Sequence, residues 1–94
     1  KGGLSALNAC MAMDFAEFNI RVNAVSPGYI KTGMTYKSYN NNKAFKKRLD
    51  RMMIKKYGSP QDIADAVLFL SSQKSKYINA TEIIVDGGFL KKGI

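Results

Sequence analysis

Apolar residues recur at steps of three and four positions in the first part of the chain, as they do on one face of an α-helix. They are Leu4, Leu7, Met11, Phe15 and Phe18. The pattern predicts a helix with a buried face that ends near Asn19, because asparagine tolerates the left-handed conformation common at helix C-termini. Residues 20–25 are short and nearly continuously apolar, which is typical of a parallel strand covered on both faces.

Pro27 and Gly28 interrupt this run and predict the end of the first strand. A long polar segment follows, with residues 39–43 as its loop-like tip and a helix expected over residues 44–54. The last apolar run, residues 81–88, predicts a second short strand that ends in two glycines.

A further helix is predicted to begin at Pro60, because proline suits the first helical position and Ser59 suits the N-cap. Asp62 places a carboxylate in the first turn, where the helix dipole favours negative charge. The residues expected to face the core are Ile63, Val67 and Leu70.

The predicted order of helix, strand, helix, helix and strand is typical of a doubly wound α/β fold with a parallel sheet. In such sheets ligands bind beyond the carboxyl ends of the strands, and the loop at Pro27 and Gly28 lies at such an end. The alternative is that this Pro-Gly pair only turns the chain.

The composition fits one small globular domain, since 46% of the 94 residues are hydrophobic and 11% are aromatic. No apolar run approaches the roughly 20 residues of a membrane span, and no secretory leader is recognisable. We therefore expect a soluble, cytoplasmic protein without a membrane partner. The chain starts at Lys1 and enters its first helical pattern without an N-cap, so we expect the C-terminal part of a longer chain.

The residue types present restrict the chemistry. The sequence has no histidine and one cysteine, Cys10, which excludes a structural zinc site, a Ser-His-Asp triad and an intrachain disulfide. No metal site is predicted, and we interpret Cys10 as a small buried side chain. Catalysis would have to use lysine, tyrosine, serine, threonine or a carboxylate.

The formal net charge of +8 is concentrated in one segment. Residues 31–56 carry nine basic side chains and one acidic side chain, whereas the rest of the chain carries six of each sign. Three interpretations of this segment are open: a solvated helix face, a surface that selects an anionic substrate or cofactor, and a nucleic-acid-binding module. The nucleic-acid reading lacks a recognisable architecture and an aromatic stacking platform.

Four stretches in fixed order, KGGLSALN, NIRVNAVSPGYIKTGM, GSPQDIADAVLFLSS and YINATEIIVDGG, resemble the short-chain dehydrogenase/reductase family over almost the whole chain. The resemblance implies that residues 1–94 are the C-terminal segment of a single NAD(P)-binding Rossmann-fold domain whose N-terminal cofactor-binding half is absent. It implies hydride transfer between NAD or NADP and a carbonyl or secondary alcohol, either small or bound to a carrier protein. It also implies a homo-oligomer, a tetramer or a dimer, and an isolated chain that is inactive.

The resemblance further implies roles for individual residues. Lys1 matches the lysine of the family's Tyr-x-x-x-Lys pair, which makes the tyrosine more acidic and binds the nicotinamide ribose; the alternative is an ordinary surface lysine. Pro27 and Gly28 would pass the nicotinamide, the backbone of Ile30 would meet its carboxamide, and the Thr32 hydroxyl would reach the carboxamide or the diphosphate.

Three other positions bear on the site. Asn23 is interpreted as structural, and Tyr29 as cover more than as a substrate contact. Many members of the family read Pro-Leu-Gly-Arg where this chain has residues 53–56, Met-Ile-Lys-Lys, so a substrate cannot be carried over from close relatives.

Overall fold

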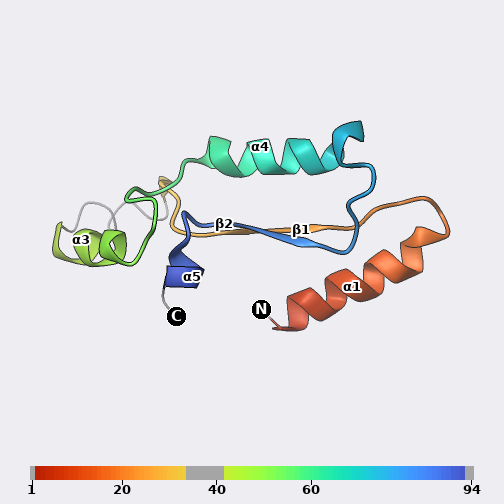
Figure 1. Cartoon of the computed structure of the whole chain (residues 1–94), viewed down its shortest axis with the longest axis horizontal. Helices are drawn as coiled ribbons and strands as arrows, with labels where there is room; N and C mark the ends of the chain where they lie inside the picture. The colour runs from red at the N-terminus through yellow and green to blue at the C-terminus, as the bar shows by residue number, and fades with distance from the viewer. Residues whose placement is uncertain (1, 34–41, 93–94) are drawn as a thin grey trace.

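The computed structural model describes residues 2–33 and 42–92 (Figure 1). Its elements are α1 (Gly2–Ala16), β1 (Ala24–Pro27), α3 (Asn42–Asp50), α4 (Pro60–Ser71), a 3-10 turn η2 (Gln73–Ser75), β2 (Glu82–Val85) and α5 (Phe89–Lys92). The predicted order of elements is confirmed, and the short helix α5 is an addition that the sequence pattern did not indicate. Most of the predicted loop tip at residues 39–43 lies outside the described residues.

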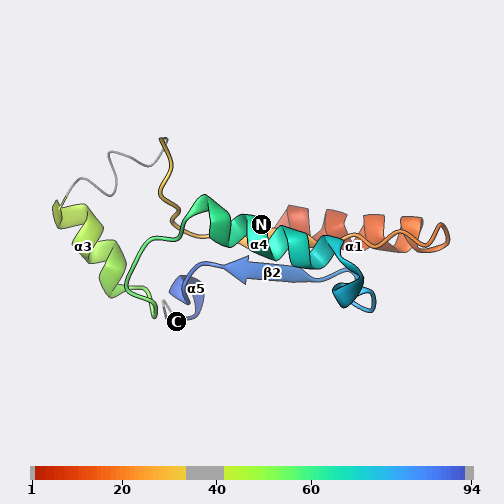
Figure 2. The same ribbon diagram turned by 90° about the horizontal axis from the view of Figure 1, so that it is seen from above.

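The strands β1 and β2 pair in parallel, in a register that runs from Ala24 opposite Glu82 to Pro27 opposite Val85. Helix α4 covers one face of this pair, and α1 lies along the other face (Figure 1). Seen from above, α4 connects the two strands as the crossover of a β-α-β unit (Figure 2). The predicted α/β class with a parallel sheet is therefore confirmed.

The first strand begins later than predicted. We expected it over residues 20–25, but β1 starts at Ala24, and Ile20 is 49% exposed. The residues before β1 form no strand pairing and instead hydrogen-bond side chains and carbonyls of the segment that leads into β2. Val22 N, for example, donates to Asn79 Oδ1 at 2.9 Å. Asn23 donates to the Ile78 carbonyl and accepts from Thr81 N, at 3.2 and 3.0 Å, which confirms its structural role.

Arg21 joins three parts of the fold through its guanidinium group. The group donates to the carbonyls of Leu70 at 2.9 Å, Ser72 at 3.3 Å and Ile78 at 3.1 Å. It thereby connects the entry to β1 with the end of α4 and the turn before β2. Hydrogen bonds from a charged donor are stronger than neutral ones, so this side chain is a principal link between the layers.

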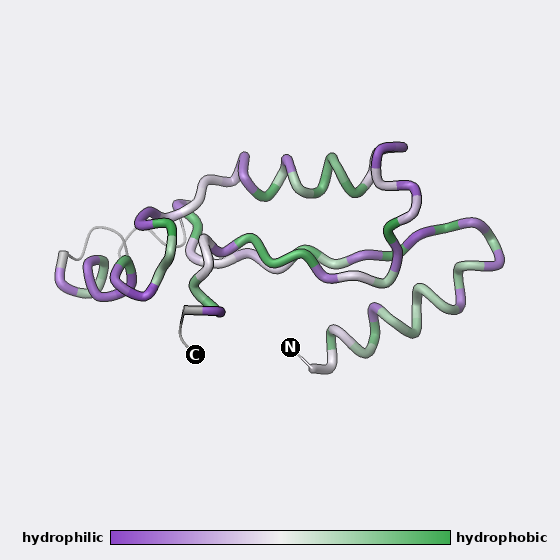
Figure 3. Tube along the Cα trace, in the orientation of Figure 1, coloured by the Kyte–Doolittle hydropathy of each residue, from purple (hydrophilic) through white to green (hydrophobic). Residues whose placement is uncertain are grey.

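The prediction of the buried face of α1 was wrong. Leu4 and Leu7 are each 54% exposed and Phe18 is 64% exposed, while the residues that α1 buries are Asn8 and Ala12. Apolar residues occur around most of the helix, as its colouring in Figure 3 shows. The face that lies against the strands is the one with small side chains, which allow a close approach and let Asn8 donate to the Thr81 carbonyl at 3.2 Å.

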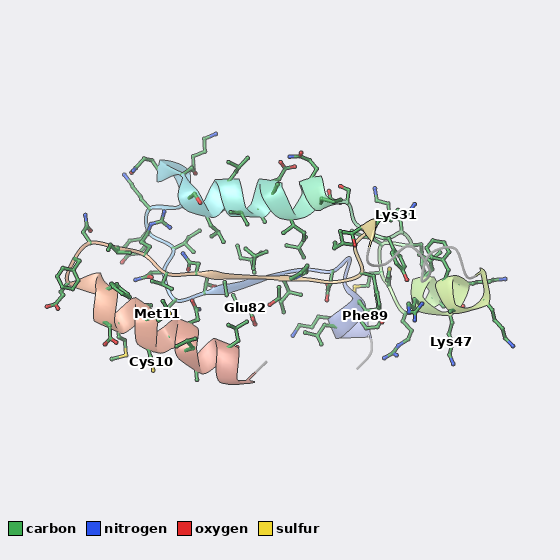
Figure 4. The ribbon with its side chains drawn as sticks, turned by 180° about the vertical axis from the view of Figure 1, so that it is seen from behind. Cys10, Met11, Lys31, Lys47, Glu82 and Phe89 are labelled. Carbon is green, nitrogen blue, oxygen red and sulfur yellow. The ribbon has the colours of Figure 1, made fainter. Side chains whose placement is uncertain are left out.

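Cys10 lies within α1, and Asn19 follows its C-terminal end. Asn19 has a φ of 62°, so the predicted left-handed residue at the end of this helix is confirmed. Cys10 is exposed, on the side of α1 turned away from the strands (Figure 4), so its interpretation as a buried side chain was wrong. Among the described residues, no helix is both long enough and apolar enough to span a membrane.

The sequence predicted the start of α4 correctly but not the end of α3. Helix α4 begins at Pro60 as predicted, with a capping box in which Ser59 and Asp62 each bond the other's backbone. Of its expected core residues, Leu70 is buried, but Val67 is 46% exposed, which corrects that assignment. The helix expected over residues 44–54 is α3 and ends at Asp50.

The early end of α3 has a tertiary cause. The backbone N–H groups of Met53 and Ile54 both donate to the Gly87 carbonyl, at 2.9 and 2.8 Å. These two residues therefore cannot continue a helix and are held against the end of β2. The preceding residue, Met52, is 1% exposed and is one of the best-buried side chains described.

We predict that Arg21→Met lowers the free energy of unfolding of the complete protein by about 2 kcal/mol, because three carbonyl acceptors lose a charged donor. Urea denaturation followed by circular dichroism measures this loss. The matched control is Lys74→Met, at an exposed residue of η2, which should change the stability by less than about 0.5 kcal/mol. Equal effects of the two substitutions would contradict the role given to Arg21.

Candidate functional site

Two hollows lie at the carboxyl ends of β1 and β2. The first, which we call the α5 hollow, has a volume of about 280 Å³ and lies between the strand ends and α5. The second, the α4 hollow, has a volume of about 400 Å³ and lies between the strand ends and the start of α4. Helix α5 is on the same side of the strands as α1 (Figure 1), so the two hollows open on opposite faces of the sheet.

The structure separates the residues that the sequence grouped together. Pro27 and Gly28 line the α5 hollow, whereas Ile30 lines the α4 hollow. Thr32 is half-buried and lines neither of these two hollows. Lys1 lies outside the described residues. The ligand contacts expected of these residues remain predictions.

Gly28 is required by the chain itself. Its N–H donates to the Val85 carbonyl at 2.9 Å, which extends the pairing of the two strands by one residue. A Cβ at this position would lie 2.6 Å from the Cβ and 2.7 Å from the Cα of Asp86. The sequence suggested that this glycine admits a ligand, but the close approach seen in the structure is to Asp86.

The loop after Gly28 is tied to the start of α4. Gly58 N donates to the Tyr29 carbonyl, and Lys31 N donates to the Gly58 carbonyl, both at 2.9 Å. Ile30 therefore pairs with Gly58 as in a parallel sheet, and a Cβ on Gly58 would lie 2.8 Å from Ile30 Cδ1. Backbone hydrogen bonds thus fix the edge of both hollows.

Asp86 organises the other side of the site and was missed in the sequence. Its carboxylate accepts from Gly88 N at 2.8 Å and from Leu90 N at 3.0 Å, so it starts helix α5. Gly87 and Gly88 have φ angles of 65° and 84°, a conformation that favours glycine. An aspartate followed by two glycines after a strand was the signal that could have indicated this turn.

An aromatic cluster forms the wall between the site and α3. The rings of Tyr29 and Tyr57 stack with centroids 5.4 Å apart, and the ring of Phe89 meets that of Tyr29 edge-on at a centroid distance of 5.3 Å. The centroid of the Phe45 ring lies 5.0 Å from that of Tyr57. Tyr29 also lines the α4 and α5 hollows, so its interpretation as cover stays a prediction. The other three rings were not foreseen, because they come from separate segments and meet only in the fold.

Basic side chains of the α3 region lie over this cluster. The Arg48 guanidinium is 5.3 Å from the centroid of the Tyr29 ring, and the Arg51 guanidinium is 4.9 Å from that of Phe89. Hydrogen bonds to Tyr29 and then to Tyr57 raise the pKa of Arg48 above its ordinary value. Like any arginine, Arg48 is positively charged throughout the physiological pH range.

Asp62 is an acidic residue of the α4 hollow. The pKa of its carboxyl is lowered, first by the hydrogen bond from Ser59 N at 2.8 Å, then by that from Ser59 Oγ, and also by the charge of Lys56. Its contribution to stability is present above the carboxyl's ordinary pKa and is lost as the pH falls through the lowered value. Helix capping accounts for this residue, so we give it no catalytic role.

The chain is similar to known proteins over nearly its whole length. A family model described as enoyl-(acyl carrier protein) reductase matches residues 1–90. A 3-oxoacyl-[acyl-carrier-protein] reductase, FabG, from Buchnera aphidicola subsp. Schizaphis graminum is 43% identical over 88 residues, which are 94% of this chain and 35% of that protein. The chain thus spans about a third of the length of this curated relative.

Solved structures agree with the sequence matches. 4-Hydroxyisoleucine dehydrogenase complexed with NADH superposes with a TM-score of 0.92 at 32% identity, over 96% of this chain and 37% of that one. A short chain dehydrogenase family protein from Francisella tularensis superposes with a TM-score of 0.83 at 33% identity, over 97% of this chain and 41% of that one. The arrangement of α1, the two strands and α4 is therefore that of these dehydrogenases.

We predict that Gly28→Ala destabilises the complete protein by about 2 kcal/mol, because the added Cβ forces the strand end away from Asp86. Gly33→Ala is the matched control, since a Cβ there meets nothing within 4 Å among the described residues. Thermal unfolding monitored by calorimetry compares the two variants. A Gly28→Ala protein as stable as the Gly33→Ala protein would contradict the contact.

Proposed function

The chain belongs to the short-chain dehydrogenase/reductase family, and we propose that residues 1–94 form the C-terminal segment of a single NAD(P)-binding Rossmann-fold domain. Two features support the proposal. Large apolar side chains of α1 face solvent in the described chain, as expected for a helix that packs against more protein. In addition, β1 pairs with β2 alone among the described strands, which leaves its other edge available for a further strand.

The proposed activity is hydride transfer between NAD or NADP and a carbonyl or secondary alcohol. The observation that carries it is the α5 hollow, which Pro27 and Gly28 line at the carboxyl end of a parallel sheet. This hollow opens on the face that α1 covers, and α1 is the helix that Lys1 precedes. The larger α4 hollow lies on the opposite face, away from α1, so we do not assign the reaction to it.

The α5 hollow suits one end of the cofactor. Pro27, Ile84 and Phe89 give it apolar walls, which fit a flat aromatic ring such as nicotinamide. Its volume of about 280 Å³ is too small for a whole dinucleotide, so the adenosine end would lie on the part of the domain outside this chain. The residues that distinguish NAD from NADP would lie there too.

The residues of this chain would bind the cofactor and control a proton. When bound, the nicotinamide supplies or accepts the hydride. The Lys1 ammonium would lower the pKa of a tyrosine four residues upstream, ordinarily about 10, so that its hydroxyl exchanges a proton with the substrate oxygen. The Ile30 backbone would meet the carboxamide, and the Thr32 hydroxyl would reach the carboxamide or the diphosphate.

The proposed substrates include both small molecules and carrier-bound molecules. The matched relatives include a reductase named for a carrier-bound substrate and a dehydrogenase named for a small hydroxy amino acid, so both small and carrier-bound substrates remain in the proposal. The departure at residues 53–56 borders the α4 hollow, which Ile54 and Lys56 line. No observation in the described residues supports the alternative of a nucleic-acid-binding module.

We also propose a homo-oligomer, a tetramer or a dimer, in the cytoplasm. The exposed apolar side chains of α1 supply a surface for a second copy, in addition to what the rest of the domain would cover. The single cysteine rules out an intrachain disulfide, which fits a reducing compartment.

We predict that Lys1→Met in the complete enzyme lowers kcat by about a hundredfold to ten-thousandfold, because the tyrosine loses the charge that makes it acidic. Steady-state kinetics measures this change, and the pH at half-maximal rate should move upward. Thr32→Val is the companion variant, in which the cofactor Kd should rise by about tenfold while kcat changes little. The isolated chain of residues 1–94 should show no activity.

A Lys1→Met enzyme that retains kcat within about threefold of the unaltered protein would end the assignment of Lys1 as the active-site lysine. Absence of NADH and NADPH binding by the complete, folded protein would overturn the proposed function itself. Circular dichroism of each variant establishes that it is folded.

We predict that the complete protein is a tetramer or dimer in solution at micromolar concentration. Static light scattering coupled to gel filtration measures the molar mass directly. Replacing Leu7 with glutamate puts a charge on the exposed apolar surface of α1 and should shift the population toward smaller species. A protein that is only monomeric at this concentration would contradict the proposal.

A further inference from the structure

We propose that Lys47, Arg48 and Arg51 bind the anionic group, a carboxylate or a phosphate, of a small-molecule substrate. The three side chains line a third hollow, which we call the cationic hollow, with a volume of about 180 Å³. The proposal rests on the proposed function, since it names the substrate class of that site. The described residues that line it are Tyr29, Ala44, Lys47, Arg48, Arg51 and Phe89.

The cationic hollow adjoins the α5 hollow. Tyr29 and Phe89 line both of them, and their rings meet edge-on with centroids 5.3 Å apart. A wall one aromatic ring thick therefore separates the three cations from the place proposed for the nicotinamide. Figure 4 shows Phe89 on α5 and Lys47 on α3 at the same end of the strands. A substrate of a few carbons beyond its carbonyl is long enough to reach past this wall.

The two arginines are positioned by the aromatic cluster. The guanidinium groups of Arg48 and Arg51 lie over the rings of Tyr29 and Phe89, at 5.3 and 4.9 Å from the centroids. Such cation–π contacts restrain side chains that would otherwise extend into water. A guanidinium held in place can offer its planar set of donors to a carboxylate or a phosphate in a bidentate manner.

Three of the described residues that line the hollow are basic: Lys47, Arg48 and Arg51. Solvation of a helix face explains Lys43 and Lys46, which are exposed and do not line the hollow. Arg48 and Arg51 instead lie over the aromatic wall beside the α5 hollow, where cation–π contacts hold them. Held beside the α5 hollow, these cations would bind the anionic group of a substrate and would also attract it from solution.

The test measures binding of three probes to the complete protein by calorimetry: succinate for a carboxylate, inorganic phosphate for a phosphate, and succinamide as the neutral analogue of succinate. We expect succinate or phosphate to bind at least about tenfold more tightly than succinamide, and less tightly as salt is added. Tighter binding of succinate assigns a carboxylate substrate, and tighter binding of phosphate assigns a phosphorylated one.

The test variant is Arg51→Met, because Arg51 contacts the wall through Phe89 alone among the described ring contacts. Anion binding should weaken by about tenfold or more in this variant, and the matched control Lys46→Met should stay within about twofold. Lys47→Met replaces Arg51→Met if the latter does not fold. The proposal is overturned if succinamide binds as well as succinate, if neither anion binds, or if the control loses as much affinity as the test variant.

Fluorescence of NADH and NADPH on the same samples keeps this proposal separate from the proposed function. We expect cofactor binding to be unchanged in Arg51→Met and Lys46→Met. A protein that binds a nicotinamide cofactor and no anion retains the proposed function and loses the anionic substrate. A protein that binds neither cofactor loses the proposed function on its own readout.

Discussion

The close approach of Gly28 to Asp86 is the contact on which the rest of the site depends. Only a residue without a Cβ lets the end of β1 lie against the end of β2 at this point. Asp86 then starts α5, which brings Phe89 to Tyr29, while the neighbouring Gly87 carbonyl holds the chain that follows α3. The absence of a Cβ at Gly28 is thus a condition for the α5 hollow, for the contact between Phe89 and Tyr29, and for the position of the chain that follows α3.

Local chemistry could be predicted from the sequence, and tertiary contacts could not. The start of α4 was predicted because Ser59 and Asp62 act within three residues of each other. The start of β1 was not, because Asn23 and its neighbours bond to residues more than fifty positions away. The prediction of the buried face of α1 was wrong because apolar residues lie on most sides of this helix. Packing against the sheet, and not the sequence pattern, therefore determines which side is buried.

The candidate site follows the same division. The family motif indicated Pro27 and Gly28, and both line the α5 hollow. Asp86 and Phe89 lie about sixty positions further along the chain, so no local pattern joined them to that loop. The sequence also revealed the excess of positive charge in residues 31–56, but only the structure shows that Arg48 and Arg51 lie over aromatic rings.

The central claim is that the end of β1 receives the nicotinamide of a dinucleotide cofactor. A crystal structure of the complete protein with NAD or NADP tests it most directly. The account predicts the nicotinamide ring in the α5 hollow, against Pro27 and Gly28. A nicotinamide bound in the α4 hollow, or away from the carboxyl ends of β1 and β2, would contradict it.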